Sequence, residues 1–277
     1  MNVEWRPLTD DDLPSLQALI GRVLAVDGGL PHAARADFLR PRFGRGIVAV
    51  ADGTIVATAG YTVDRGGTGA VDPEWRGQGL GTHLLGWLAE EAGDALVVST
   101  ESLTDEADAL FRRHGLRRTN SDQIMRIDLR AGEPSAPLVA ELTEWSDAAS
   151  TRFFACYEAS FRDRPGFPGW TERQWVDWVS EDLDPQWTLL ASRAGEDVGF
   201  VVGADDEESG WITQVGVVPA GRGTGLGAGL TAEAVRRMRS AGRESALLDV
   251  NDNNPGAARV YERLGFTRIG RRGRYAR

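Results

Sequence analysis

Closely spaced glycines follow an apolar run in the second half of the sequence. The run Val215 to Pro219 precedes Arg222, and glycines then stand at every second position from Gly223 to Gly229. An apolar run, a glycine-rich turn and a helical apolar pattern predict a strand, a tight turn and a helix. The first N–H groups of a helix have no partner within the helix and lie at the positive end of its dipole. We therefore expect this stretch to bind phosphate.

The same pattern occurs earlier in the chain, between Val71 and Gly81. The corresponding residues, all at one constant offset, are Pro73 and Pro219, Arg76 and Arg222, Gly79 and Gly225, and Gly81 and Gly227. Two copies in register indicate an internal duplication. The glycine spacing differs from the G-x-G-x-x-G pattern of dinucleotide-binding folds, which argues against a nicotinamide cofactor.

Length and composition limit the classes of function. The 277 residues are enough for two domains, and 42% hydrophobic with 26% charged residues is an ordinary globular composition. The net charge of -10 disfavours nucleic acid as a partner and favours a cationic amine. The single cysteine, Cys156, excludes an internal disulfide. With neither a signal pattern nor a long apolar run, we expect a cytoplasmic protein with no membrane partner, and we predict no metal site.

Each half of the chain shows the same predicted order of elements. A strand is followed by two helices, a hairpin, a further strand, the phosphate loop with its helix, a strand, a short helix and a last strand. Residues 130–137 contain two prolines, a glycine and a serine, which is typical of a linker. The predicted division is a domain at 1–131, a linker at 132–137 and a domain at 138–277.

The motifs and the element order resemble the GNAT superfamily of acetyl-CoA-dependent N-acetyltransferases. The resemblance rests on R-G-x-G-x-G at the central helix and on N-x-x-A-x-x-x-Y-x-x-x-G-F, which runs from Asn254 to Phe266. Two such domains in tandem look most like the mycothiol synthase branch, although this chain has Gly166 where that branch has a glutamate. The resemblance implies an α/β fold with two tandem domains. Each would have a mostly antiparallel sheet, flanked by helices, whose parallel central strands splay apart around acetyl-CoA.

The resemblance also implies the residues that contact acetyl-CoA. The backbone of Val215, Gly216 and Val217 would lie along the pantetheine arm. The diphosphate and its surroundings would be bound by Arg222, Gly223, Thr224, Gly225, Leu226, Gly227, Ala228 and Asn254, and in the first half by Arg76, Gly77, Gln78, Gly79, Leu80 and Gly81.

Tyr261 matches the superfamily tyrosine that protonates the departing CoA sulfur. A phenol with a pKa of about 10 is protonated at pH 7 and can donate to a thiolate. Phe111 stands in the equivalent place in the first half, so that half is predicted to bind acetyl-CoA without turning it over. The base that removes the amine proton stays open among Glu158, Asp163 and Asp249.

Substrate specificity in the superfamily lies in the first two helices and their loop. Candidate substrate contacts are Tyr157, Phe161, Asp163, Phe167 and Trp170. The predicted function is transfer of an acetyl group to a primary amine of a small molecule by a monomer or weak homodimer. Alternatives are acetylation of an amino-sugar–cysteine conjugate, a non-catalytic acetyl-CoA sensor, or a nucleotide-binding protein.

Overall fold

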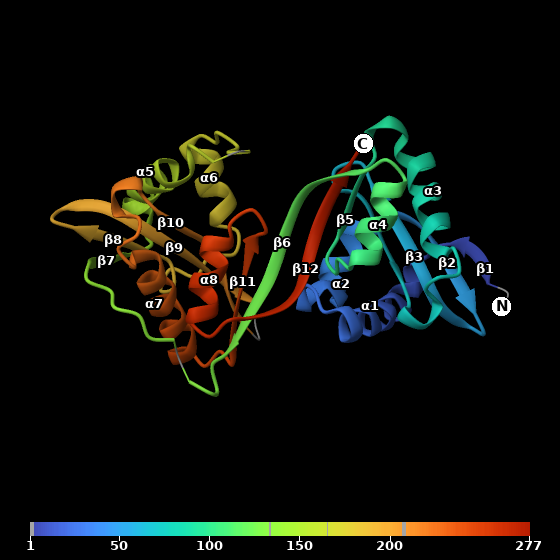
Figure 1. Ribbon diagram of the computed structural model, residues 1–277, viewed down its shortest axis with the longest axis horizontal. Helices are drawn as coiled ribbons and strands as arrows, with labels where there is room; N and C mark the ends of the chain where they lie inside the picture. Colours follow the sequence, from blue (N-terminus) through green and yellow to red (C-terminus); the bar gives the residue numbers. More distant parts are fainter. Residues whose placement is uncertain (1–2, 133, 165, 207–208) are drawn as a thin grey trace. The chain divides into compact units, whose positions relative to one another are not determined.

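The computed structural model describes residues 3–132, 134–164, 166–206 and 209–277. The chain forms two compact units that are not contiguous in sequence (Figure 1). Unit 1 comprises Met1–Ile124, Asn251–Asn253 and Ile269–Arg277, and unit 2 comprises Met125–Val250 and Asn254–Arg268. The predicted boundaries at 131 and 138 follow chain order and stay a prediction, and residue 133 of the predicted linker lies outside the described residues.

The first half of the chain supplies most of unit 1. Its elements are β1 (Glu4–Pro7), α1 (Leu13–Asp27), α2 (Ala36–Leu39), β2 (Arg45–Ala51), β3 (Thr54–Thr62), β4 (Gly66–Val71), α3 (Leu80–Ala92), β5 (Val97–Thr100), α4 (Asp105–Arg113) and β6 (Arg117–Asp128). Strand β6 begins at Arg117, whereas the sequence predicts a strand from Gln123. The added residues are all polar, with residues 117–120 exposed and Ser121 and Asp122 buried, so they lack the apolar alternation that predicts a strand.

The second half repeats this order of elements. They are β7 (Glu141–Glu144), α5 (Ser150–Phe161), α6 (Glu172–Val179), β8 (Leu189–Arg193), β9 (Glu196–Asp206), β10 (Ser209–Val217), α7 (Leu226–Ser240), β11 (Ser245–Asn251), α8 (Pro255–Arg263) and β12 (Thr267–Ala276). Among the described residues the strand order is β1-β2-β3-β4-β5-β12-β6-β11-β10-β9-β8-β7. Most neighbours are antiparallel, while β4 with β5 and β10 with β11 are parallel, so the predicted fold class is confirmed.

The final strand of the chain completes the sheet of unit 1. Strand β12 pairs antiparallel with β5, with Gly273 opposite Thr100 and Ala276 opposite Val97. In Figure 1 the red ribbon of β12 lies beside β5. The Tyr275 side chain on this strand is fully buried in the core of unit 1. Unit 1 therefore depends on residues that follow unit 2 in the sequence.

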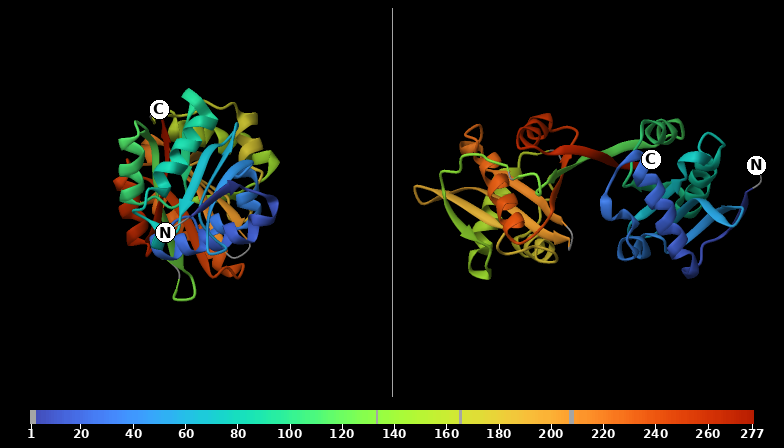
Figure 2. Two further views of the ribbon diagram at one scale, coloured as in Figure 1. Left: turned by 90° about the vertical axis from the view of Figure 1, so that its right-hand side faces the viewer. Right: turned by 90° about the horizontal axis from the view of Figure 1, so that it is seen from below.

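Helices cover both faces of the sheet in each unit (Figure 2). In unit 1, α3 packs on the face that carries Ala49 and Val56, and α1 packs on the face that carries Val48 and Ile55. Because successive strand residues point to opposite faces, this alternation separates the two cores. In unit 2, α7 and α8 cover one face, and α5 and α6 cover the other. Within the described part of the chain, no helix is long and apolar enough to cross a membrane.

Candidate active site

The two predicted phosphate loops have the same backbone conformation. Gly77 and Gly79 have φ of +75° and +85°, and Gly223 and Gly225 have φ of +76° and +80°. This left-handed region strongly favours glycine, which explains why the spacing recurs in both copies. Gly79 and Gly225 are the N-caps of α3 and α7, and neither helix has a side-chain cap. The first N–H groups of both helices are thus available to an anion.

Strands β10 and β11 of unit 2 separate beyond a short paired segment. Their parallel register runs from Ser209 opposite Ser245 to Ile212 opposite Leu248, whereas β10 continues to Val217. A bulge in the pairing of β10 with β9 falls between Ile212 and Gln214, where the separation begins. The predicted pantetheine contacts Val215, Gly216 and Val217 all lie on the separated part of β10. In unit 1, the parallel register of β4 and β5 consists of Gly67 opposite Val98.

Tyr261 lies in the second turn of α8. The helix is capped by Asn254, whose side-chain oxygen accepts a hydrogen bond from the N–H of Ala257 at 3.2 Å. The Tyr261 ring packs edge-on against Phe266, with 6.1 Å between centroids. Burial raises the pKa of the Tyr261 phenol to about 12, while Arg164 opposes the rise and Asp249 adds to it. The phenol therefore stays protonated through the neutral range and can act as a proton donor.

The three carboxylates proposed as the base lie in different surroundings. Glu158 forms an ion pair with Arg162 at 3.0 Å on the exposed side of α5, and Asp163 is exposed in the loop after that helix. Asp249 is half-buried on β11, directly after Leu248, the last residue paired with β10. Of the three, Asp249 thus stands at the point where the strands separate, and its charge acts on Tyr261.

Aromatic rings from α5, α6 and their connecting loop form a cluster in unit 2. Tyr157 is buried there and stacks on Trp175 with 5.0 Å between centroids, so it packs in the core. Phe161 and Phe167 contact Tyr157 and are half-buried, and Trp170 pairs with Trp178 at 5.2 Å. The indole N–H of Trp175 donates to the side-chain oxygen of Gln214 on β10 at 3.2 Å. The cluster therefore contacts β10 beside the bulge.

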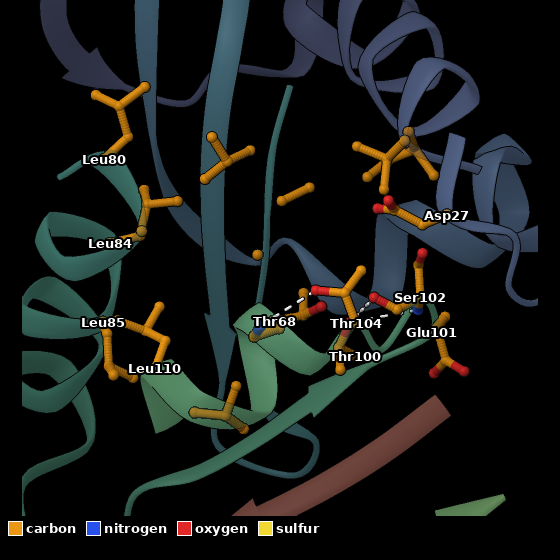
Figure 3. A pocket seen from close by; sticks show the side chains of 18 of the residues that line it. Asp27, Thr68, Leu80, Leu84, Leu85, Thr100, Glu101, Ser102, Thr104 and Leu110 are labelled. Atoms are coloured by element: carbon orange, nitrogen blue, oxygen red, sulfur yellow. Dashed lines mark hydrogen bonds between the residues drawn. The ribbon is translucent and has the colours of Figure 1, made fainter. Parts of the chain in front are cut away.

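Unit 1 contains a cavity of about 640 Å³ between its phosphate loop and α1, α2 and α4. Figure 3 shows Leu80, Leu84 and Leu85 of α3 on one side of it, with Asp27 and Ser102 on the opposite side. Of the predicted loop residues of unit 1, the cavity wall includes Arg76, Gly77, Gly79, Leu80 and Gly81. One carboxylate oxygen of Glu101, which also lines the cavity, is buried without a hydrogen-bond partner among the described residues.

Phe111 in α4 occupies the helix position that Tyr261 occupies in α8. Each is the seventh residue of its helix. The backbone carbonyl of Phe111 accepts a hydrogen bond from the N–H of Leu116 at 3.0 Å, and that of Tyr261 accepts one from the N–H of Phe266 at 3.0 Å. Thr104 caps α4 as Asn254 caps α8. The Phe111 ring lies in the cavity wall of unit 1 and contacts Tyr275, with 4.6 Å between centroids. Unit 1 has no phenol at this position.

Two polar partners of the phosphate loops were not predicted from sequence. The Asp27 carboxylate, at the end of α1, pairs with Arg76 through two hydrogen bonds of 2.8 and 2.5 Å. Arg193, at the end of β8, donates to the hydroxyl of Thr224 at 3.3 Å. Both partners lie far from the loops in sequence, so no local spacing reveals them. Among the described residues, no group of three or more potential metal ligands is present.

Comparisons with known proteins agree with this geometry. Residues 140–266 match the acetyltransferase (GNAT) family, and residues 43–117 match an acetyltransferase (GNAT) domain. The chain is 34% identical to a mycothiol acetyltransferase from Stackebrandtia nassauensis, over 79% of this chain and 77% of that protein. It is 30% identical to a mycothiol acetyltransferase from Thermomonospora curvata, over 94% of this chain and 92% of that protein.

Solved structures show the same architecture. A GCN5-related N-acetyltransferase from Sphaerobacter thermophilus superposes with a TM-score of 0.78 at 27% identity, covering 99% of this chain and 94% of that chain. A tandem GNAT protein from the clavulanic acid biosynthesis pathway has a TM-score of 0.60 at 17% identity, covering 99% of this chain and 98% of that chain, which shows a shared fold.

The fold, the two phosphate loops and the similarity to known acetyltransferases together show that this protein is an acyltransferase. The chain belongs to the GNAT acetyltransferase family and carries two GNAT domains in tandem. GNAT acetyltransferases use acetyl-CoA as the acyl donor.

Proposed function

We propose that unit 2 transfers an acetyl group from acetyl-CoA to a primary amine of a small molecule. The observation that carries the proposal is the separation of β10 from β11, with the phosphate loop after β10 and with Asp249 on β11. The charge of Asp249 acts on Tyr261, which supports the pairing of a proton acceptor with a proton donor near the separated strands. This arrangement supports chemistry at a thioester placed between the two strands.

The residues of unit 2 that would bind acetyl-CoA are those predicted from sequence. The N–H groups of the loop from Arg222 to Ala228 would bind its diphosphate, as uncapped helix termini do. The separated backbone of Val215, Gly216 and Val217 would lie along the pantetheine arm. Acetyl-CoA supplies the acetyl thioester. A backbone N–H directed at the thioester carbonyl would stabilise the negative charge that develops on its oxygen.

Tyr261 and Asp249 would divide the proton transfers between them. The amine nitrogen forms a bond to the acetyl carbon as the carbon–sulfur bond breaks. Asp249 accepts a proton from the amine, directly or through water, because a protonated amine has no lone pair for attack. Tyr261 donates its phenolic proton to the departing sulfur, which leaves as the CoA thiol. The nitrogen loses its second proton to solvent as the amide forms. The Tyr261 phenolate then regains a proton from solvent and Asp249 releases its proton there, so one proton is released for each protonated amine that is acetylated.

The acceptor site would lie beside α5 and α6, where aromatic rings meet β10. Phe161, Phe167 and Trp170 are half-buried and offer apolar contact area, while Asp163 is exposed in the same loop. The net charge of -10 favours a cationic acceptor. A second candidate acceptor is an amino-sugar–cysteine conjugate, which is supported by the relatives named mycothiol acetyltransferase at 30–34% identity.

Unit 1 would have a different role, since Phe111 cannot donate a proton. Its cavity and its loop residues Arg76 to Gly81 support the prediction that it binds acetyl-CoA without turnover. Turnover would then depend on unit 2 alone.

The experiment is an assay of CoA thiol release from acetyl-CoA against a panel of primary amines, including amino sugars and an amino-sugar–cysteine conjugate. The acetylated product is identified by mass spectrometry. We expect amine-dependent release with one acetyl group added per thiol. Binding of acetyl-CoA without release for any amine would instead support the sensor alternative. Absence of acetyl-CoA binding would refute the proposal.

A further inference from the structure

The equivalent arginines of the two phosphate loops differ in the charge of their hydrogen-bond partners. In unit 1, both terminal nitrogens of Arg76 donate to the Asp27 carboxylate, and the Asp27 side chain is 7% exposed. In unit 2, Arg222 donates to two neutral carbonyl oxygens, that of Val217 at 3.2 Å and that of Ser160 at 2.9 Å. The charge of Arg76 is thus neutralised within the protein, whereas these contacts leave the charge of Arg222 uncompensated.

The other charged residues around the loops also make loop 1 more acidic than loop 2. Loop 1, residues 72–79, contains Asp72 and Glu74, and loop 2, residues 218–225, has Val218 and Ala220 at these positions. Asp72 is paired with Arg22 at 2.6 Å, while Glu74 is exposed. The pKa of Arg76 is raised, chiefly by its hydrogen bonds to Asp27, with Glu106 and Asp72 adding to the effect. Loop 1 therefore lies in an acidic environment.

Loop 2 gains a second cation instead. Arg193, the last residue of β8, donates one terminal nitrogen to the hydroxyl of Thr224 at 3.3 Å, and its Nε donates to the carbonyl of Val139 at 2.8 Å. The last residue of β2, which holds the equivalent place in unit 1, is Ala51. Arg222 and Arg193 thus bring two positive charges to loop 2.

These differences predict unequal binding of the same anion. A diphosphate that contacts Arg76 must compete with Asp27, and separating the pair would leave a carboxylate buried without its partner. A diphosphate at loop 2 meets two arginines whose partners are uncharged, so it adds charge-assisted hydrogen bonds without breaking an ion pair.

We propose that Asp27 is an internal competitor of the CoA diphosphate in unit 1, and that Arg193 is a phosphate-binding residue of unit 2. Acetyl-CoA then binds tightly to unit 2 and much more weakly to unit 1. The proposal rests on the proposed function in that it takes acetyl-CoA as the ligand of loop 2.

The experiment measures binding of acetyl-CoA to the full chain by native mass spectrometry and titration calorimetry. For the wild type we expect one tight site and a second at least tenfold weaker. Asp27→Asn should tighten the second site about tenfold, and Arg193→Gln should weaken the first about tenfold. Gly225→Val, which places a branched side chain at a left-handed φ, removes the tight site and so assigns it to unit 2.

Two controls separate competition for phosphate from a general change in the cavity. Asp37→Asn removes the carboxylate of another bidentate aspartate–arginine pair of unit 1, that with Arg35, and should change neither site. Acetyl-pantetheine, which has the arm without phosphates, should bind wild type and Asp27→Asn equally. Thermal unfolding without ligand checks that each variant is folded.

The outcomes distinguish this inference from the proposed function. Two equal wild-type sites, or a second site that Asp27→Asn leaves unchanged, overturn the role of Asp27 while acetyl-CoA binding stands. A tight site that Arg193→Gln leaves unchanged overturns the role of Arg193. If neither loop binds acetyl-CoA, both proposals fail.

Discussion

The phenol of Tyr275 on β12 donates a hydrogen bond to Asp108 on α4 at 2.5 Å. The two residues are far apart in sequence and meet in the core of unit 1, where the Tyr275 side chain is fully buried. The bond fastens the final strand to the helix that carries Phe111, whose ring also contacts Tyr275. The last strand of the chain and a helix of its first half thus share one core.

Removing residues 269–277 should therefore unfold or loosen unit 1 while sparing unit 2. The deletion exposes the edge of β5 and removes the buried Tyr275 from the core. Amide hydrogen exchange should become fast in β4 and β5 and stay slow in β9 and β10. The milder variant Tyr275→Phe removes one donor to Asp108, which keeps its ion pair with Arg112, and should lower the free energy of unfolding by about 1 kcal/mol. Unchanged exchange in β5 after the deletion would contradict the pairing.

Tyr261→Phe should lower kcat about a hundredfold or more, since the departing sulfur loses its proton donor. The loss should appear in kcat with little change in acetyl-CoA binding, because the phenol is not part of the phosphate loop. The control is Tyr61→Phe, which removes a phenol from β3 of unit 1 and should keep full activity. Wild-type activity in Tyr261→Phe would rule out Tyr261 as the acid.

Asp249→Asn should move the rising limb of the pH–rate profile to higher pH. Without the carboxylate, only amine molecules that are already unprotonated can attack, and the unprotonated fraction of the amine grows with pH. We expect at least a tenfold loss of kcat/KM at pH 7 that shrinks by pH 10. Tyr261 should not limit activity in this range, because its pKa is raised to about 12 and the phenol stays protonated below that value. A loss independent of pH would point to a structural role, and Glu158→Gln serves as the matched control.

Asp12→Asn should lower stability in a manner that depends on pH. The Asp12 carboxylate pairs with Arg6 at 2.6 Å and accepts the Thr9 N–H at 2.9 Å, and these bonds hold its pKa well below the usual range. Its contribution, about 1–2 kcal/mol, is present above the unfolded pKa of about 4 and is lost as pH falls further. Urea unfolding should show the full difference at pH 7 and a smaller one at pH 3. Asp64→Asn, at an exposed site, should behave as wild type at both values.

Cys156 should resist thiol reagents in the folded protein. The thiol is buried against α6 in the aromatic cluster, and burial raises its pKa to about 12. Since the thiolate is the reactive form, labelling at pH 8 should be about a hundredfold or more slower than in denaturant. Rapid labelling of the native protein would show that α5 opens readily.

Local sequence patterns predicted most of the helices and strands and part of the candidate site. The glycine spacing reports left-handed turns that glycine favours, and the Asn254-to-Phe266 motif reports a capped helix, so both loops and Tyr261 could be placed. The pairing of β12 with β5 could not be predicted, because the residue pattern of a strand does not determine which strand it pairs with. Asp27 and Arg193 could not be predicted either, because each contacts a phosphate loop that is distant in sequence and is brought close only by the fold.

The late position of β12 also orders events during synthesis. Residues 269–277 leave the ribosome only after the whole of residues 125–250 has been made. At about 5–20 residues per second, β5 waits roughly ten to thirty seconds for its neighbour. The half of the protein that is translated first is therefore the last to acquire its complete sheet, and unit 2 can fold while unit 1 is still open at one edge.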